Sequence, residues 1–207
     1  MSARETAQAS DPVDGRVQRG ERSRQRIVAA LFDLVGAGVL QPTAQQVAAR
    51  AGVGMRTVFR HFSEMETLYA AMNGRLDGEV RPALMAARRV GPLSERVAGL
   101  VRQRARLFER VAPYKRAANL QRWRSRYLEG RHRVMQRDLR ADLLSWLPEL
   151  RDAPASAVET VDLVTSFEAW ERLRNDQRLG VKAAMAVVEQ TVERSLRARA
   201  PRSRRAG

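Results

Sequence analysis

Residues 41–69 carry the sequence QPTAQQVAARAGVGMRTVFRHFSEMETLY, in which helix start and stop signals follow one another closely. Thr43 and Gln46 have the spacing of a capping box, so a helix is predicted to begin there. Gly52 favours the left-handed conformation that ends a helix. A second helix is then predicted from about Gly54. This stretch is therefore expected to hold several short helices separated by tight turns.

A third helix is predicted after Ser63, which has the spacing of a second capping box with Glu66. Each helix carries a short apolar stripe that is expected to face inward. The stripes consist of Val47, Ala48 and Ala51 in the first helix, Val58 and Phe62 in the second, and Met65, Leu68 and Tyr69 in the third. Two helices of about eight residues, joined by a short turn centred on glycine, form a helix-turn-helix.

From Thr43 to Leu68 the sequence resembles, without a gap, the DNA-binding motif of the tetracycline-repressor (TetR) family of bacterial regulators. The resemblance is carried by Thr43, Ala51-Gly52-Val53, Thr57, His61-Phe62, Glu66 and Leu68. The close match covers roughly residues 24–70, and the rest of the chain resembles the family in helical layout only. The resemblance implies an all-α fold of about nine helices, with an N-terminal helix-turn-helix domain and a C-terminal helical domain for ligand binding and dimerisation.

Four segments are predicted along the chain: a disordered basic arm (1–20), the helix-turn-helix domain (21–69), a regulatory and dimerisation domain (70–199) and a basic tail (200–207). Apolar periodicity predicts further helices at about 21–36, 64–89, 93–111, 113–124, 125–147, 155–177 and 181–198. No alternating apolar and polar run indicates a strand, so periodicity also favours an all-α chain.

The composition narrows the classes of function. The chain has 207 residues, of which 44% are hydrophobic, so a globular protein is expected. It has no cysteine and only two histidines, and no cluster of acidic residues supports those histidines as metal ligands. Neither an apolar run of about 18 residues nor a signal peptide is evident. We therefore expect a cytoplasmic protein without cofactor, metal or catalytic residues.

The formal net charge of +15 favours a polyanionic partner, but the charge is unevenly distributed. Residues 27–69 carry three basic and three acidic side chains, whereas residues 70–150 carry 18 basic and eight acidic ones. The predicted DNA-reading segment is therefore neutral. Charge composition alone would instead place the DNA-binding surface in residues 70–150.

The resemblance implies that the helix at about 54–61 enters the major groove, where base edges can be distinguished. Its predicted DNA-binding residues are Gly54, Met55, Arg56, Thr57, Phe59, Arg60 and His61. Arg56 is the strongest candidate for base readout, because a guanidinium can donate two hydrogen bonds to guanine. Thr57 is expected to touch a phosphate or a thymine methyl group, and His61 is expected to donate to a phosphate.

Thr43, Ala44 and Gln45 are predicted to hold phosphates at the start of the supporting helix, where backbone N–H groups are free. The chain departs from the family pattern at Phe59, where tyrosine is usual, and at Met65, where lysine is usual. Two phosphate contacts are therefore missing, and we expect a shallower salt dependence of DNA binding than is usual for the family. Arginines near the N-terminus could compensate, or that arm could be a solvated tail.

A two-fold dimer would place two reading helices about 34–36 Å apart on a near-palindromic operator. The resemblance puts the dimer contact on the last two helices. The residues predicted for this contact are Val158, Val161, Val164, Thr165, Ala184, Val188, Thr191, Val192 and Ser195. The alternative is that these stripes face the core of their own chain.

Control by a small-molecule effector is implied by the resemblance rather than by a motif. The candidate ligand-binding residues are Phe108, Tyr114, Trp123, Tyr127, Phe167 and Trp170, although a place in the core is the simpler expectation for each of them taken singly. The arginines of residues 102–140 are compatible with an anionic ligand or with a solvated face.

Three functions remain open from the sequence: a repressor released from its operator by a small molecule, a weakly specific architectural DNA-binding protein without ligand control, and a helical enzyme. The last is the least favoured, because no catalytic constellation is present.

Overall fold

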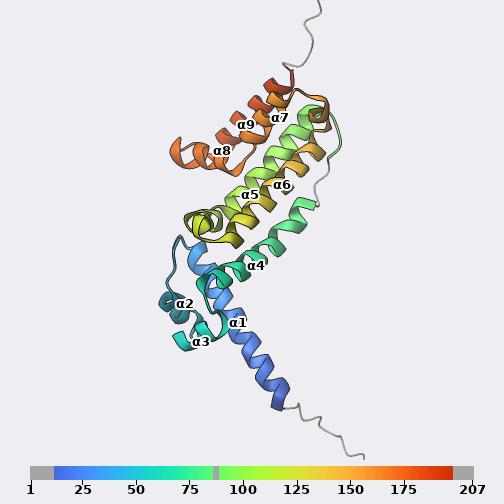
Figure 1. The fold of residues 1–207 in the computed structure, drawn as a ribbon. Coiled ribbons are helices and arrows are strands. Elements are labelled where there is room, and N and C mark those ends of the chain that lie inside the picture. Colours follow the sequence, from blue (N-terminus) through green and yellow to red (C-terminus); the bar gives the residue numbers. More distant parts are fainter. Residues whose placement is uncertain (1–11, 86–88, 198–207) are drawn as a thin grey trace, which may run out of the picture.

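The computed structural model describes residues 12–85 and 89–197, and within these residues the chain forms nine α-helices and no strand (Figure 1). The helices are α1 (Pro12–Gly36), α2 (Ala44–Ala51), α3 (Met55–His61), α4 (Met65–Met85), α5 (Leu93–Gln121), α6 (Arg126–Trp146), α7 (Ala155–Val164), α8 (Phe167–Glu171) and α9 (Val181–Arg197). Two short 3-10 turns, Arg122–Arg124 and Pro148–Asp152, and one π-type turn, Arg172–Asp176, lie between them. The all-α prediction is confirmed.

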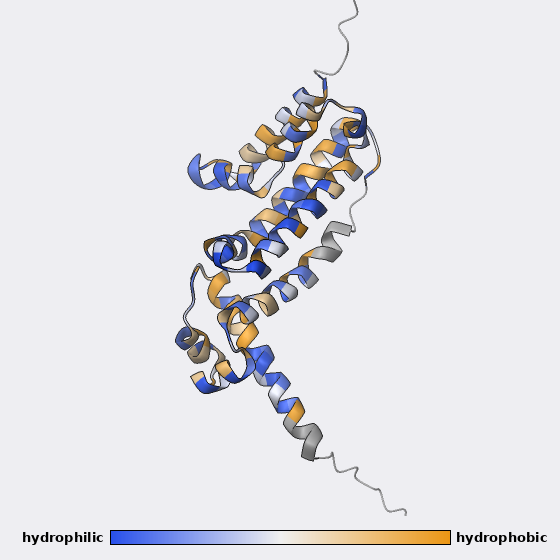
Figure 2. Ribbon diagram, in the orientation of Figure 1, coloured by the Kyte–Doolittle hydropathy of each residue, from blue (hydrophilic) through white to orange (hydrophobic). Residues whose placement is uncertain are grey.

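The helices form two groups joined by α1, α4 and α5. At one end of the molecule α2 and α3 pack on α1, and at the other end α7 and α9 pack together and α9 lies along α5 (Figure 1). The part of α1 that projects from the molecule is mostly hydrophilic (Figure 2). The helix-turn-helix therefore forms a head that stands on a larger helical body.

One continuous apolar core connects this head to the body. In the head Ile27, Leu31, Val47 and Val58 are almost completely buried. At the junction the ring of Phe32 in α1 lies 4.3 Å from that of Tyr114 in α5, measured between ring centroids. The head is therefore attached by side-chain packing as well as by the chain connection.

The first helix begins earlier than predicted. Residues 12–20 are helical, so the expectation of disorder is wrong for them, while residues 1–11 and the predicted tail at 200–207 lie outside the described residues. Pro12 occupies the first helical position, where the missing N–H has no partner within the helix in any case.

Two helices predicted on either side of Pro113 are one helix, α5. Proline normally disrupts a helix interior because it removes one hydrogen bond. Here Val111 and Ala112 before the proline, and Tyr114 after it, are all buried. The packing of both halves against the same core holds the helix together through the defect.

Conversely, the single helix predicted at 155–177 is divided. The hydroxyl of Thr165 donates to the carbonyl of Val161 at 2.7 Å, and Ser166 caps α8 by accepting from the N–H of Ala169 at 3.1 Å. Adjacent hydroxyl side chains offer the backbone alternatives to the helical hydrogen bonds, and here they end α7. The described residues thus form the predicted number of helices, but the boundaries of these helices differ from the predicted ones.

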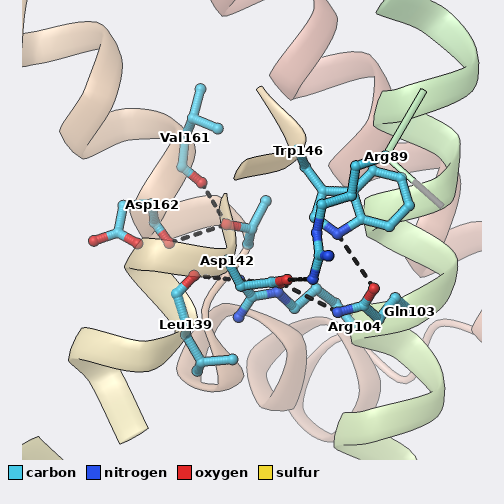
Figure 3. A network of polar contacts seen from close by, with 9 residues as sticks. Arg89, Gln103, Arg104, Leu139, Asp142, Trp146, Val161 and Asp162 are labelled. Atoms are coloured by element: carbon cyan, nitrogen blue, oxygen red, sulfur yellow. Dashed lines mark hydrogen bonds and ion pairs between the residues drawn. The ribbon is translucent and has the colours of Figure 1, made fainter. Parts of the chain in front are cut away.

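A buried arginine joins α5 to α6 (Figure 3). Arg104 donates to the carbonyl of Leu139 at 2.5 Å and to the Asp142 carboxylate at 3.2 Å. The same carboxylate accepts from Arg89 at 2.8 Å and from Gln103 at 3.2 Å. Burial lowers the pKa of Arg104 to about 10, against the opposing effect of Asp142. Asp142 therefore supplies the negative charge that a buried guanidinium requires.

No helix in residues 12–85 or 89–197 is both long enough and apolar enough to span a membrane.

Candidate nucleic-acid interface

The start and end of α2 are formed as the sequence predicts. The N–H of Gln46 donates to Thr43 Oγ1 at 3.2 Å, and the N–H of Thr43 donates to Gln46 Oε1 at 2.9 Å, which completes the capping box. Gly52 adopts the left-handed conformation with φ 62°, and its N–H bonds to the carbonyls of the last helical turn. These local signals set the length of the supporting helix.

An arginine from α1 holds the turn between α2 and α3. Arg26 Nη2 donates to the carbonyl of Ala51 at 2.5 Å and to that of Gly52 at 3.2 Å. The guanidinium of Arg24 lies 5.2 Å from the ring centroid of Phe62. These two arginines thus stabilise the head through contacts with the turn and with Phe62, although both residues, like Arg19 and Arg22, are exposed.

Gly52→Ala is expected to destabilise the protein by about 1–3 kcal/mol, because a Cβ costs roughly 1–2 kcal/mol in the left-handed region. That Cβ would also lie 2.8 Å from Arg26 Nη2, so the arginine would have to move from its carbonyl acceptors. Urea unfolding at equilibrium measures the change. Gly74→Ala, in the middle of α4 with open space around it, is the control and should be neutral or slightly stabilising.

The orientation of α3 separates its predicted core residues from its predicted DNA-binding residues. Val58 is buried, and so is Phe62, the residue that follows the helix. The opposite face is exposed at Gly54, Met55, Arg56, Phe59 and Arg60, while Thr57 is half-buried. Within the described residues neither Arg56 nor Arg60 has an ion pair, so both guanidinium groups are available to an external acceptor.

The start of α2 carries the second group of predicted DNA-binding residues. Thr43 and Gln45 are exposed and Ala44 is half-buried. Thr43 Oγ1 accepts a hydrogen bond from the N–H of Gln46, which leaves its own proton for an external acceptor such as a phosphate oxygen. The cap and the phosphate contact predicted for Thr43 are therefore compatible.

One ring nitrogen of His61 is covered within the chain. This atom, Nε2, is buried and has no hydrogen-bond partner among the described residues. A Cβ built on Gly20 of α1 would lie 4.0 Å from the imidazole Cε1, so this side of the ring faces α1. Nε2 is therefore not available to a phosphate in this conformation, and the phosphate contact predicted for His61, which would have to use Nδ1, stays a prediction.

The predicted capping box between Ser63 and Glu66 is also wrong. Since α4 begins at Met65, Glu66 is its second residue and does not occupy the required third position. The Glu66 carboxylate instead accepts a hydrogen bond from the hydroxyl of Ser125, which also caps α6 by accepting from the N–H of Leu128 at 3.1 Å. The first turn of α4, next to the head, is thereby linked to the first turn of α6.

The six candidate ligand-binding aromatics lie in different environments within the described part of the chain. Phe108, Phe167, Trp170 and Tyr114 are buried. Phe108 and Phe167 pack edge to face, with ring centroids 5.6 Å apart, as ordinary core. Tyr127 is at the surface, and Trp123 is 74% exposed beside an open hollow at the junction of head and body. Aromatic residue type alone does not distinguish these locations.

Among known proteins, no family model matches this sequence, and no curated protein matches it as a sequence relative. Solved structures are similar to it in fold. A transcriptional regulator from Rhodococcus sp. Rha1 superposes with a TM-score of 0.66 at 20% identity, over 85% of this chain and 97% of that one. A TetR-family regulator from Streptomyces coelicolor gives a TM-score of 0.64 at 22% identity, over 86% of this chain and 81% of that one.

A third structure, of a Mesorhizobium loti protein assigned to the TetR family of regulators, gives a TM-score of 0.60 at 17% identity, over 87% of this chain and 98% of that one. At these identities the similarity establishes the fold. The chain thus has the fold of TetR-family transcriptional regulators, as the resemblance of residues 43–68 implies.

Proposed function

We propose that this protein is a sequence-specific DNA-binding transcriptional regulator, and that it represses transcription until a small molecule releases it from its operator. The observation that carries the proposal is the division of α3 into a buried side and an exposed side. Arg56 stands on the exposed side and has no ion pair with any of the described residues, while Val58 and Phe62 anchor the helix to the head. This is the arrangement that a major-groove reading helix needs.

The ion pairs of the body favour this function over a weakly specific architectural protein. The architectural alternative rests on the excess of basic residues at 70–150. In that region ion pairs with carboxylates engage Arg75, Arg89, Arg96, Arg104, Arg110, Arg116, Arg122, Arg131, Arg133, Arg137 and Arg140. Eleven of the 18 basic side chains of this region are therefore engaged in ion pairs within the chain, which leaves fewer of them available for binding DNA without regard to sequence.

A homodimer is part of the proposal, because one reading helix contacts too few base pairs for specificity in a genome. The residues predicted for the dimer contact need correction. Val161, Thr165, Ala184, Val188 and Val192 are buried within a single chain, so they form its own core. The large apolar residues that α7 and α9 leave exposed are Leu163, Val181 and Val187. We infer that the partner chain packs on these outward faces.

Leu163→Glu is expected to convert the dimer to a monomer, because a charge would replace a leucine that is 68% exposed in the single chain and buried in the dimer. Light scattering at micromolar concentration measures the change in mass. Leu120→Glu, an exposed leucine of α5, is the matched control and should leave the mass unchanged. If the wild-type protein is already a monomer, this part of the proposal fails.

The effector would act through α4, which follows the head directly. A ligand releases DNA only if it binds the DNA-incompetent state more tightly than the competent one. The Glu66–Ser125 hydrogen bond supports this route, since a movement of α6 relative to α5 would pull on the first turn of α4.

The function is tested by selecting genomic DNA fragments with the purified protein, sequencing them and footprinting the best fragment. A short protected near-palindrome supports a sequence-specific regulator, whereas uniform coverage supports the architectural alternative. Compounds are then screened for release of the selected fragment, and a salt titration of its binding tests the expected shallow slope.

A further inference from the structure

Two cationic side chains are buried in the body of the molecule, and only one of them has a carboxylate partner among the described residues. Arg104 is 4% exposed and Lys115 is 8% exposed. Arg104 has the carboxylate of Asp142 at 3.2 Å, and Figure 3 shows Asp142 between Arg104 and Arg89. The fold therefore neutralises its buried arginine with a carboxylate of its own.

Lys115 has no such counter-charge. Its Nζ lies 2.8 Å from Nδ1 of His132, and no carboxylate of the described residues lies within 4.0 Å. Burial is the main factor that lowers the pKa of Lys115, while the more distant Glu168 opposes this. Burial, followed by the neighbouring Lys115 and Arg122, lowers the pKa of His132. A neutral His132 can accept one of the three ammonium protons, which leaves the others without an anion.

The surroundings of Lys115 leave room for an anion. Lys115, His132 and Arg122 line a cavity of about 50 Å³, together with Tyr114 and Asn119. One water needs roughly 10–15 Å³ measured in this way, so the cavity can hold a group the size of a carboxylate. Polar donors are thus gathered around a small space.

This polar cavity adjoins a larger one between α4 and α6. The second cavity has a volume of about 450 Å³, and the two share the lining residues Asp77, Arg131 and Met135. Its apolar lining comes from Val80, Leu107, Val134, Met135, Leu139 and Ala141. Sites for small organic ligands typically have volumes of about 300–1,000 Å³ and mostly apolar walls.

We propose that the two cavities form one binding site for an apolar monocarboxylic acid, with its carboxylate on the Lys115 ammonium and its hydrocarbon body in the cavity between α4 and α6. This proposal gives the chemical class of the effector and rests on the proposed function only for its effect on DNA. The carboxylate provides the counter-charge that the chain itself supplies to Arg104 and not to Lys115.

The lining also selects against other anions. The polar cavity is too small for a nucleotide. In the larger cavity the two lining arginines, Arg89 and Arg131, are already paired with Asp142 and Asp77, so a second acidic group on the ligand would find no unneutralised cation among the described lining residues. A neutral ligand of the same shape would leave the ammonium without its counter-charge. The site should therefore prefer octanoate to both acetate and octanamide.

The first test uses the fact that Lys115 and Lys182 are the only lysines of the chain. Labelling lysine with ¹³C at Cε gives two signals, which Lys182→Met assigns. Octanoate is expected to shift the Lys115 signal and to raise the pKa of its ammonium group, because the carboxylate stabilises the charged form. The Lys182 signal, from an exposed side chain of α9, should not move. An unchanged Lys115 signal at millimolar octanoate would overturn the proposal.

The second test measures octanoate affinity by calorimetry in the DNA-free protein. Lys115→Met keeps the length of the side chain and removes its charge, and is expected to weaken binding by about 10- to 100-fold. Lys182→Met is the matched control and should bind like the wild type. Octanamide should bind the wild-type protein at least about tenfold more weakly than octanoate. Equal octanoate affinity in the two lysine variants would contradict the proposal.

The two proposals can fail separately. Both binding experiments are made without DNA, so they test the site even if no operator exists. If octanoate binds through Lys115 but does not release the selected DNA fragment, the site stands and its role as the effector site fails. If the fragment is protected but octanoate does not bind, the regulator stands and the monocarboxylate site fails.

Discussion

Arg56→Ala is expected to weaken binding to the selected operator by roughly thirty-fold to twenty-thousand-fold. A bidentate contact between arginine and guanine is worth about 1–3 kcal/mol, and a dimer makes that contact twice, so the loss is about 2–6 kcal/mol. Arg56 is exposed on α3 and forms no ion pair in the described part of the chain, so the fold itself should be unaffected. Fluorescence anisotropy with the footprinted fragment measures the affinity, and a thermal melt checks the fold.

Two further variants separate base readout from simple attraction of charge. Arg56→Lys keeps the charge but loses the two-pronged geometry, so it should resemble the alanine variant on the operator and the wild type on random DNA. Arg151→Ala removes an exposed arginine far from the head and should change operator affinity less than about twofold. If Arg56→Ala binds the operator as tightly as the wild type, α3 does not read the DNA sequence through this residue.

Asp142→Ala is expected to cost about 3–5 kcal/mol of folding free energy, the largest stability effect expected of the ion pairs in the body. The substitution removes the carboxylate that accepts from Arg104, Arg89 and Gln103, and Arg104 would remain buried with its charge uncompensated (Figure 3). Urea unfolding at equilibrium measures the loss.

The control lies one turn earlier on the same helix. Asp138 pairs with Arg137 at 3.5 Å and both side chains are exposed, so Asp138→Ala should change stability by less than about 0.5 kcal/mol. Replacing both members of the buried pair, as Arg104→Met with Asp142→Leu, should recover much of the loss, because the almost fully buried guanidinium of Arg104 is removed together with its carboxylate. Equal losses for Asp138→Ala and Asp142→Ala would show that burial of the pair does not govern its energy.

Much of the head could be predicted because its signals act over a few residues. The capping box of Thr43 and Gln46 and the left-handed Gly52 depend on hydrogen bonds between residues three or four apart, so they can be recognised in the chain itself. The buried side of α3 follows from helical periodicity in the same way. The contacts of its exposed side with DNA remain predictions.

The sequence did not predict contacts between segments that are far apart in the chain. Arg26 belongs to the turn after α2, and the Glu66 carboxylate belongs to Ser125 in α6. Neither partnership leaves a local trace in the sequence, because the residues are 25 or more positions apart and meet only after the helices pack. The same reason explains why an apolar stripe on α9 could be assigned either to a partner chain or to its own core.

Local hydrogen bonding and apolar spacing are thus sufficient to specify an all-helical chain, its helix-turn-helix and the residues that anchor α3. Packing alone decides that α5 continues through Pro113, that α1 covers His61 Nε2, and that Lys115 is buried beside His132 with no carboxylate of the described residues within 4.0 Å. These outcomes depend on which surfaces exclude water from one another. That free energy is set by the assembled helices and not by the order of residues within any one of them.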